Sequence, residues 1–146
     1  WGWFEPDIVQ APFNIFDQRL LTTGWASLLH EAGTEIHLRS AFLQGLLLMP
    51  ATLVPKQFAP WAELFKHWFD WQTGSRASAL ELAIQFNLSQ PWADKIVVGV
   101  ETAQQLKDLI AAAQSELPEI PRQLRHGVTD EGLINPSKWT ELCQPQ

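Results

Sequence analysis

The feature that most constrains this chain is an alternation between short apolar segments and longer segments with helical periodicity. Three short segments, at residues 6–14, 34–40 and 94–101, carry the β-branched or alternating apolar residues of strands. Four longer segments, at residues 22–33, 60–74, 78–91 and 101–114, have the periodicity of helices. Short apolar strands that alternate with helices are typical of a parallel sheet covered by helices. We therefore predict an α/β fold in the order strand, helix, strand, two helices, strand, helix.

Each predicted helix carries one apolar stripe with a spacing of three or four residues. We expect these stripes to face the core, and Gly74 is placed to end the second helix. In chain order the four stripes are Trp25, Leu28, Leu29 and Ala32; Trp61, Leu64, Phe65 and Trp68; Leu80, Ala83, Ile84 and Leu88; and Leu106, Leu109, Ile110 and Ala113.

Polar residues and glycine mark the ends of two helices. Thr22 or Thr23 can cap the start of the first helix, and Gly33 is placed to end it in a left-handed conformation. Thr102 and Gln105 have the spacing of a capping box at the start of the last helix.

Composition excludes several kinds of partner and structure. The net charge is −6 and the ten Lys and Arg residues are scattered, which argues against a nucleic-acid surface. No apolar run approaches the roughly 18 residues needed to cross a bilayer, so we predict no membrane partner. A lone cysteine, Cys143, excludes an internal disulfide and indicates a cytoplasmic setting.

Two features indicate a part of a larger domain. Three parallel strands alone make a small sheet with two exposed edges. The chain starts at Trp1 and its only methionine is Met49, so we expect a fragment or a processed chain. It also contains no tyrosine, so any phenol proton donor has to lie elsewhere.

The sequence resembles the C-terminal part of the aldo/keto reductase family, whose members fold as (β/α)8 TIM barrels. Four segments carry the resemblance in order: "DIVQAPFNIFDQRLL", "GTEIHLRSAFLQGLLL", "LSQPWADKIVVGVETAQQLKDLI" and "LINPSKW". The resemblance implies that residues 1–146 form a single partial domain with the last three strands of the barrel and their helices. An irregular tail is expected at about 117–146, anchored by Leu133, Ile134 and Trp139.

The resemblance implies an NAD(P)H-dependent oxidoreductase that transfers a hydride between a nicotinamide cofactor and a small carbonyl or alcohol substrate. The family's catalytic Asp, Tyr, Lys and His lie on earlier strands, in the missing N-terminal half of the barrel. No residue of this chain is therefore assigned a catalytic role, and this part supplies cofactor-binding loops. The alternative is a non-catalytic cofactor-binding or regulatory module on the same fold.

Ligands of TIM barrels bind at the carboxyl ends of the strands, and the first candidate there is Gln10. The resemblance places it against the nicotinamide carboxamide, with which a side-chain amide can both donate and accept hydrogen bonds. The alternative is a strand-end glutamine that bonds nearby backbone.

The second candidate is the segment after the second strand, where the resemblance implies that Ser40, Gly45 and backbone N–H groups hold the pyrophosphate. Phe42 stands where the family usually has Leu, and Gln44 lies within the same motif. Arg39 stands where the family usually has an aromatic residue that stacks on the nicotinamide. A guanidinium can also stack on a ring. A pyrophosphate partner, a substrate-carboxylate partner and a structural ion pair remain open as its role.

The third candidate is the segment after the last strand, where the family holds the adenosine end of NADP or NAD at a helix N-terminus. Gly99, Thr102, Gln105 and Asp108 fall on matching positions, although simple helix capping also explains Thr102 and Gln105. Glu101 occupies a position that is often Lys or Arg in NADP-binding members. This implies tolerance of NAD or a weakened preference for NADPH.

The histidines and tryptophans receive plainer interpretations. The four histidines lack the spacing of a metal site, so we predict no bound metal. Trp61, Trp68 and Trp71 have helical spacing, which favours core packing over a partner surface.

Overall fold

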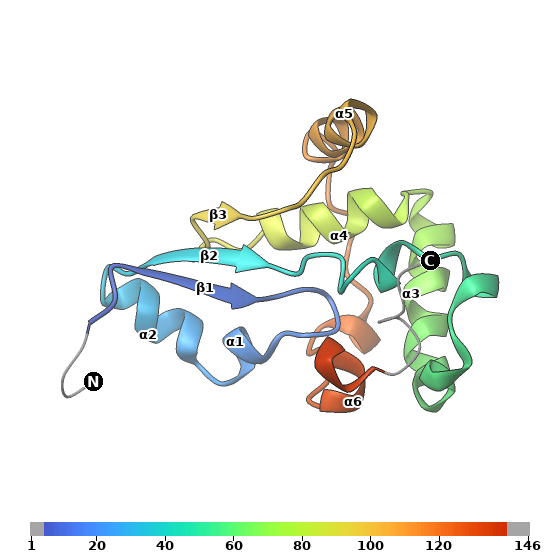
Figure 1. Cartoon of the computed structure of the whole chain (residues 1–146), viewed down its shortest axis with the longest axis horizontal. Coiled ribbons are helices and arrows are strands. Elements are labelled where there is room, and N and C mark those ends of the chain that lie inside the picture. The colour runs from blue at the N-terminus through green and yellow to red at the C-terminus, as the bar shows by residue number, and fades with distance from the viewer. Residues whose placement is uncertain (1–4, 140–146) are drawn as a thin grey trace.

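A three-stranded parallel sheet forms the centre of the fold, as the sequence predicts (Figure 1). The computed structural model describes residues 5–139, so Cys143 and the end of the predicted tail lie outside the described residues. The sheet has the order β1-β2-β3, with both pairs parallel, and its strands are β1 (Ile8–Pro12), β2 (Glu35–Arg39) and β3 (Lys95–Ile96). Among the described residues, β1 and β3 therefore each have one open edge.

Helices follow the strands in the predicted order, with additional short turns. None of the helices within residues 5–139 is long and apolar enough to cross a membrane. In that range the α-helices are α1 (Arg19–Thr22), α2 (Trp25–Glu31), α3 (Ala62–Ser75), α4 (Ala79–Leu88), α5 (Ala103–Ala112) and α6 (Glu131–Ile134).

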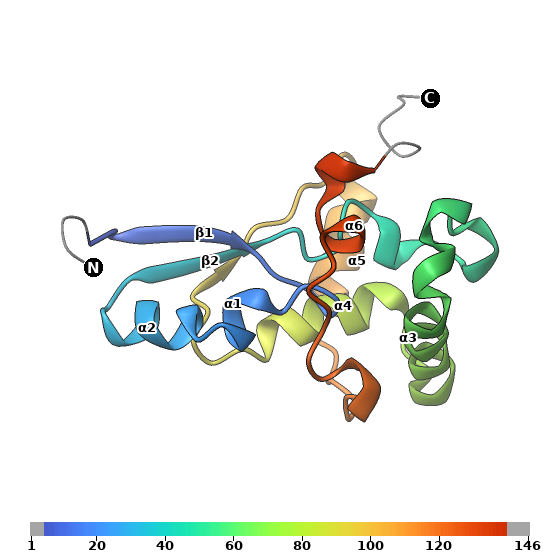
Figure 2. The ribbon, with the colours of Figure 1, turned by 90° about the horizontal axis from the view of Figure 1, so that it is seen from below.

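The two faces of the sheet differ. On β2, Ile36 and Leu38 are fully buried and join the core, whereas His37 points to the other face, which confirms the predicted alternation. Helices α1, α2 and α4 lie together on one side of the strands (Figure 2). β1 is more exposed than β2, with Ile8 54% exposed, because it lies at an open edge.

The side of the sheet away from Ile36 and Leu38 is polar, and we call it the open face. Side chains alternate along a strand, and residues paired in parallel register point to the same side. The pairing therefore assigns to the open face Ile8, Gln10, Pro12, Glu35, His37, Arg39 and Lys95. Glu35 Oε1 lies 2.7 Å from His37 Nε2 and also accepts a hydrogen bond from Lys95 Nζ. The contact with His37, followed by that with Lys95, holds the pKa of Glu35 below its ordinary value.

Helix α2 differs from its prediction. An extra helical turn, α1, ends at Thr22, so neither Thr22 nor Thr23 caps α2; its N-cap is Gly24 with φ 82°. Its buried residues are Ala26 and Leu29, whereas three members of the predicted stripe are exposed, namely Trp25, Leu28 and Ala32. The left-handed conformation predicted for Gly33 is confirmed, with φ 75°.

Helix α3 begins and ends later than predicted. Pro60 lies in a preceding 3-10 segment, Lys56–Trp61, because the chain approaches α3 through a series of tight turns. Gly74 remains within the helix, and Arg76 takes the left-handed position after it, with φ 56°. Trp68 is fully buried, Trp71 is 5% exposed and Trp61 is partly buried against the core, which confirms core packing for the three tryptophans.

Helix α4 is covered on most of its surface, because it lies between the sheet and α5. It buries a continuous run from Leu82 to Asn87, so the predicted single stripe is too narrow, and Leu88 at its end is 48% exposed. Ser78 and Glu81 form a reciprocal capping box at its start.

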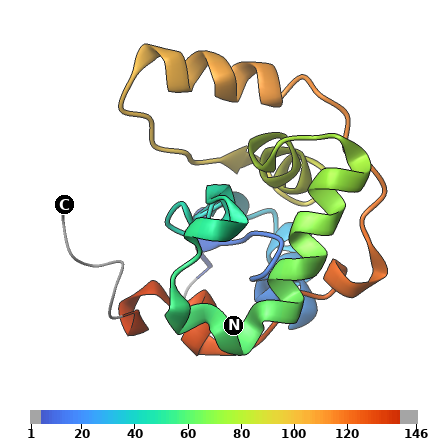
Figure 3. The ribbon, with the colours of Figure 1, turned by 90° about the vertical axis from the view of Figure 1, so that its right-hand side faces the viewer.

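The predicted strand at 94–101 is wrong over most of its length. Only Lys95–Ile96 pairs with β2, and Val97 and Val100 are 43% and 40% exposed. The pairing stops soon after Ile96 because β2 itself ends at Arg39, and the chain turns away at Ser40, which has φ 61°. Helix α5, which follows, lies apart from the main body and packs on α4 (Figure 3). It buries Leu109 and Ala112, whereas three members of its predicted stripe are exposed, namely Leu106, Ile110 and Ala113.

The tail is irregular, as predicted, and is fastened to the first loop of the fold. The side-chain amide of Gln18, which is buried, donates to the carbonyls of Ile15 and Leu124, both at 2.8 Å. Val128 N donates to Phe16 O at 2.7 Å. The predicted anchors are confirmed as buried: Leu133, Ile134 and Trp139.

Candidate functional site

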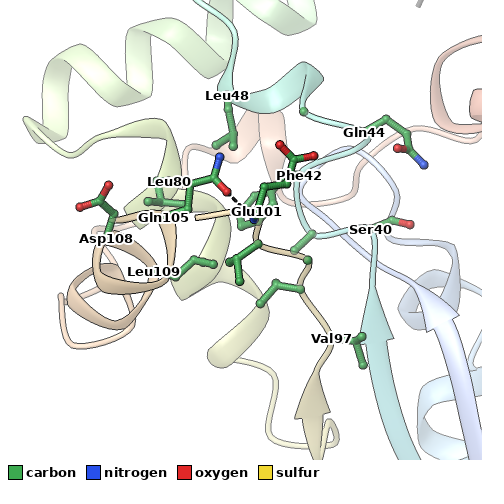
Figure 4. Close-up of a pocket in the computed structure, with 15 residues that line it drawn as sticks. Ser40, Phe42, Gln44, Leu48, Leu80, Val97, Glu101, Gln105, Asp108 and Leu109 are labelled. Atoms are coloured by element: carbon green, nitrogen blue, oxygen red, sulfur yellow. Dashed lines mark hydrogen bonds between the residues drawn. The ribbon is translucent and has the colours of Figure 1, made fainter. Parts of the chain in front are cut away.

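A cavity of about 700 Å³ lies where the chain leaves β2 and β3 (Figure 4). One wall is formed by residues 40–48 and the other by residues 97–109, with Leu80 of α4 completing the lining. Both walls follow the carboxyl ends of adjacent parallel strands, which is where ligands of such sheets bind. The volume is within the usual range for a small-molecule site, roughly 300–1,000 Å³.

The wall after β2 has an uncommon backbone conformation. Ser40, Leu43, Gln44 and Gly45 all have positive φ, at 61°, 47°, 54° and 83°. Only the last of these is a glycine, so three residues with side chains occupy a conformation that ordinarily favours glycine. Left-handed residues in a tight turn arrange backbone N–H groups into concavities that bind anions.

Tertiary contacts hold this wall in place. Asn14, which is fully buried, donates from its side-chain amide to Ser40 O at 3.1 Å. Trp68 Nε1 donates to Leu47 O at 3.1 Å from α3. Leu43 and Leu46 point into the core, whereas Phe42 and Gln44 line the cavity. The alternation in "AFLQGLLL" therefore separates residues that anchor the turn from residues that face the cavity.

The wall after β3 is organised by the start of α5. Thr102 Oγ1 accepts a hydrogen bond from Gln105 N at 3.1 Å, as a capping residue does. Gln105 Oε1 accepts from Glu101 N at 2.7 Å, which fixes the residue before the cap (Figure 4). The predicted capping by Thr102 is confirmed. In a standard capping box the Gln105 side chain would accept from the N–H of Thr102, whereas here it accepts from the N–H of Glu101, one residue earlier.

Charge is distributed unevenly around the cavity. Its lining contains two carboxylates, Glu101 and Asp108, and no lysine or arginine. Asp108 Oδ1 accepts a hydrogen bond from Gln104 Nε2 at 2.8 Å, so it is already partnered. Arg39 is exposed just outside the lining, and its Nη1 donates to Ser40 Oγ at 3.2 Å. Positive charge therefore lies at the β2 end and negative charge at the α5 end.

The structure brings most of the predicted site residues together. Eight of them line the one cavity: Ser40, Phe42, Gln44, Gly45, Gly99, Glu101, Gln105 and Asp108. Gln10, Arg39 and Thr102 do not line it. Gln10 lies on the open face of β1, in register with His37 of β2, and Thr102 serves as the helix cap.

Sequence reasoning missed the apolar part of the lining and the anchor of its turn. The additional lining residues are Ala41, Leu48, Leu80, Val97, Val98, Val100 and Leu109. Val97 to Val100 have the pattern of a buried strand, so the sequence did not indicate that they line a cavity. Asn14 carries a signal that could have been used, because an Asn in the loop after a strand favours a side-chain turn. Its Oδ1 accepts from Phe16 N and Asp17 N at 3.0 and 2.9 Å.

Metal-binding groups do not cluster in the part of the chain that the structure describes. No three His, Cys, Asp or Glu residues within residues 5–139 lie close enough together to hold a metal ion.

Known structures share this fold, although no family model and no curated protein sequence matches the chain. The structure is similar to the holo form of aldo-keto reductase AKR11C1 from Bacillus halodurans, with a TM-score of 0.61 and 16% identity over 86% of this chain. Its similarity to the apo form gives a TM-score of 0.62 at the same identity and coverage. The chain spans only 45% and 46% of those two structures. The predicted fold, a part of a (β/α)8 barrel, is therefore confirmed.

Proposed function

We propose that this chain forms the cofactor-binding part of an aldo/keto reductase-like oxidoreductase that uses NAD or NADP. The complete enzyme would transfer a hydride between the nicotinamide and a small carbonyl or alcohol substrate. The observation that carries the proposal is the cavity at the carboxyl ends of β2 and β3, between a left-handed turn and a helix N-terminus. The shared fold with an aldo-keto reductase supports it at the level of architecture.

The residues present fit a dinucleotide. The turn at Ser40–Gly45 offers backbone N–H groups and a hydroxyl to a pyrophosphate, with the guanidinium of Arg39 beside it. A side chain added at Gly99 would meet no atom within 4 Å, so the backbone there is open to a ligand. Gln10 is exposed on the open face, where its amide is free to meet a carboxamide. The bound nicotinamide would supply or accept the hydride.

We propose that the proton-transfer groups lie in another segment, since the sequence contains no tyrosine. That segment would be the N-terminal half of the same barrel, a run of parallel βα units that adds to the open edges of β1 and β3. The exposed apolar residues support this partner, since eight of the eleven large ones in the described part of the chain belong to β1, to the chain leaving β3 and to the helices that follow these strands. Four belong to β1 and the two helices after it, and four to the chain leaving β3 and to α5: Ile8, Leu21, Trp25 and Leu28; Val97, Val100, Leu106 and Ile110. Unpaired strand edges of this kind recruit further strands.

The test is a titration of the ¹⁵N-labelled 146-residue chain with NAD⁺, followed through its amide resonances. We expect weak binding that shifts amides of residues 40–48 and 97–105. Gly99→Phe should abolish these shifts by filling the cavity, whereas Gly74→Phe, also in open space but on α3, should leave them unchanged. Shifts confined to other regions, or no shifts at 20 mM ligand, would contradict the proposal. Carbonyl reduction by the isolated chain would contradict the placement of the catalytic groups elsewhere.

A further inference from the structure

We infer that a second cavity binds an apolar molecule with a single carboxylate, through an aromatic floor and two lysines at its rim. This cavity, which we call the α3 cavity, has a volume of about 400 Å³ and is lined by residues of the turns at 51–59 and of α3 at 62–70. Helix α3 lies beyond the carboxyl ends of the strands (Figure 1). The α3 cavity shares no lining residue with the first cavity, so the inference does not depend on the proposed function.

The floor of the α3 cavity is aromatic and is held in place by ring contacts. Phe58 and Phe65 are buried and Phe69 is partly buried. The ring centroid of Phe65 lies 6.1 Å from that of Phe58 and 6.2 Å from that of Phe69. Trp139 packs edge-on against Phe58 at 5.0 Å, and Phe58 N donates to Pro55 O at 3.0 Å. Because the floor is ordered before a ligand arrives, little entropy is lost when an apolar group binds to it.

The rim of the α3 cavity carries more positive than negative charge. Lys56 comes from the 3-10 segment and Lys66 from α3, and the third ionisable residue of the lining is Asp70. Lys66 Nζ donates to Asp70 Oδ2 at 2.7 Å, which leaves two of its three N–H groups for a ligand. The ammonium of Lys56 has no hydrogen-bond or ion-pair partner among the described residues. An excess of one positive charge therefore borders an apolar floor, although the whole chain has a net charge of −6.

This combination favours a monoanion with an apolar body. A carboxylate can accept charge-assisted hydrogen bonds from both lysines while the rings remove apolar ligand atoms from water. A monoanion balances the excess positive charge, whereas a phosphate of charge about −1.5 to −2 would leave unbalanced charge beside an apolar surface. The volume is near the lower end of the usual range for small-molecule sites, roughly 300–1,000 Å³, and suits one ring with a short chain.

The experiment compares two probes with the same apolar body on the ¹⁵N-labelled 146-residue chain: 4-phenylbutyrate and 4-phenylbutanol. We expect the carboxylate to shift the amides of residues 56–59 and 65–70 with a Kd of roughly 1–3 mM, as is usual for a ligand of this size. The alcohol should bind about fivefold more weakly at low salt, because it lacks the charge that meets the free ammonium. Screening should reduce this ratio as the ionic strength rises.

Two pairs of variants separate the effect of charge from the effect of space. Lys56→Gln should weaken binding of the carboxylate about threefold and leave binding of the alcohol unchanged. Lys107→Gln, at an exposed position of α5 outside the lining, should change neither. Ala62→Trp should abolish binding of both probes by filling the α3 cavity, whereas Ala103→Trp should leave it intact. Both alanines are exposed first residues of a helix, and only Ala62 lines the cavity.

Each of four results would overturn the inference. Binding of the alcohol as tight as that of the carboxylate would remove the role of the lysines. Shifts that survive Ala62→Trp would place the probes elsewhere. Shifts of the same amides when the chain is concentrated without a probe would show that a second copy occupies the cavity. No shifts at about 20 mM 4-phenylbutyrate would show that the cavity does not take this class of ligand. None of these results alters the outcome of the NAD⁺ titration, so the two proposals fail separately.

Discussion

Replacing Gly127 with alanine tests how the tail is fastened to the body of the protein. Gly127 has φ 59°, and a Cβ there would lie 2.6 Å from the carbonyl oxygen of Phe16 and 3.1 Å from Gln18 Cγ. That carbonyl accepts the hydrogen bond from Val128 N. Alanine therefore collides with the acceptor of the bond that joins the tail to the first loop.

The expected cost follows from these contacts. A left-handed conformation costs an L-residue roughly 1–2 kcal/mol relative to glycine. Displacing the tail weakens or breaks the Val128–Phe16 bond, at about 0.5–1.5 kcal/mol. Gln18 must also shift, although its amide bridges two carbonyls. We expect Gly127→Ala to lower the free energy of unfolding by about 2–4 kcal/mol.

Urea unfolding followed by tryptophan fluorescence measures this change. With a slope of about 2 kcal/mol per molar urea, the midpoint should fall by about 1–2 M. The matched control is Gly74→Ala, because Gly74 lies inside α3 with open space around it and should gain up to about 1 kcal/mol from the substitution. The reasoning is refuted if Gly127→Ala stays within about 0.5 kcal/mol of the parent, or if Gly74→Ala destabilises as strongly.

Two further substitutions test the helices that support the site. Ser78→Ala removes the capping box of α4 and should cost about 1 kcal/mol at pH 7. The bonds from Ser78 hold the pKa of Glu81 below its ordinary value of 4.5, so their stabilisation is complete above that pH and is lost as the pH falls through the lowered value. Urea unfolding should therefore give a smaller difference between the Ser78→Ala variant and the parent at pH 3 than at pH 7; an equal difference would contradict the assignment. Trp68→Phe removes the donor to Leu47 O, strands that carbonyl and should cost about 2–3 kcal/mol. Hydrogen exchange of the amides at 46–48 should accelerate, and unchanged exchange would mean that α3 does not hold the cavity wall.

Features set by local chemistry could be predicted from the sequence. The alternation of Ile36 and Leu38 with His37 follows from which face of β2 is buried, and one strand is enough to reveal it. The left-handed Gly33 and the cap at Thr102 likewise depend on residues within one helical turn. Eight site residues fall on one cavity because the carboxyl ends of neighbouring parallel strands meet at the same edge of a sheet.

Features set by tertiary contacts could not be predicted from local patterns. Val97 and Val100 have the composition of a buried strand, but with no second neighbour they remain exposed beside a cavity. The stripe of α5 contains Leu106 and Ile110, yet the helix packs mainly on α4, so both side chains are exposed. The positive φ of Leu43 has no signal in its own residue type, since distant residues hold the turn.

The charged residues on the open face limit which segments could complete a barrel with this chain. A TIM-barrel interior is ordinarily filled by branched aliphatic side chains. Closing such an interior over Glu35, Lys95 and Arg39 would remove their water, at several kcal/mol for each ion that is left without a partner. The first two already bond to each other, whereas Arg39 has only the hydroxyl of Ser40 among the described residues. We therefore expect the half-barrel proposed above to place an acidic or anion-holding group against Arg39 when it covers the open face.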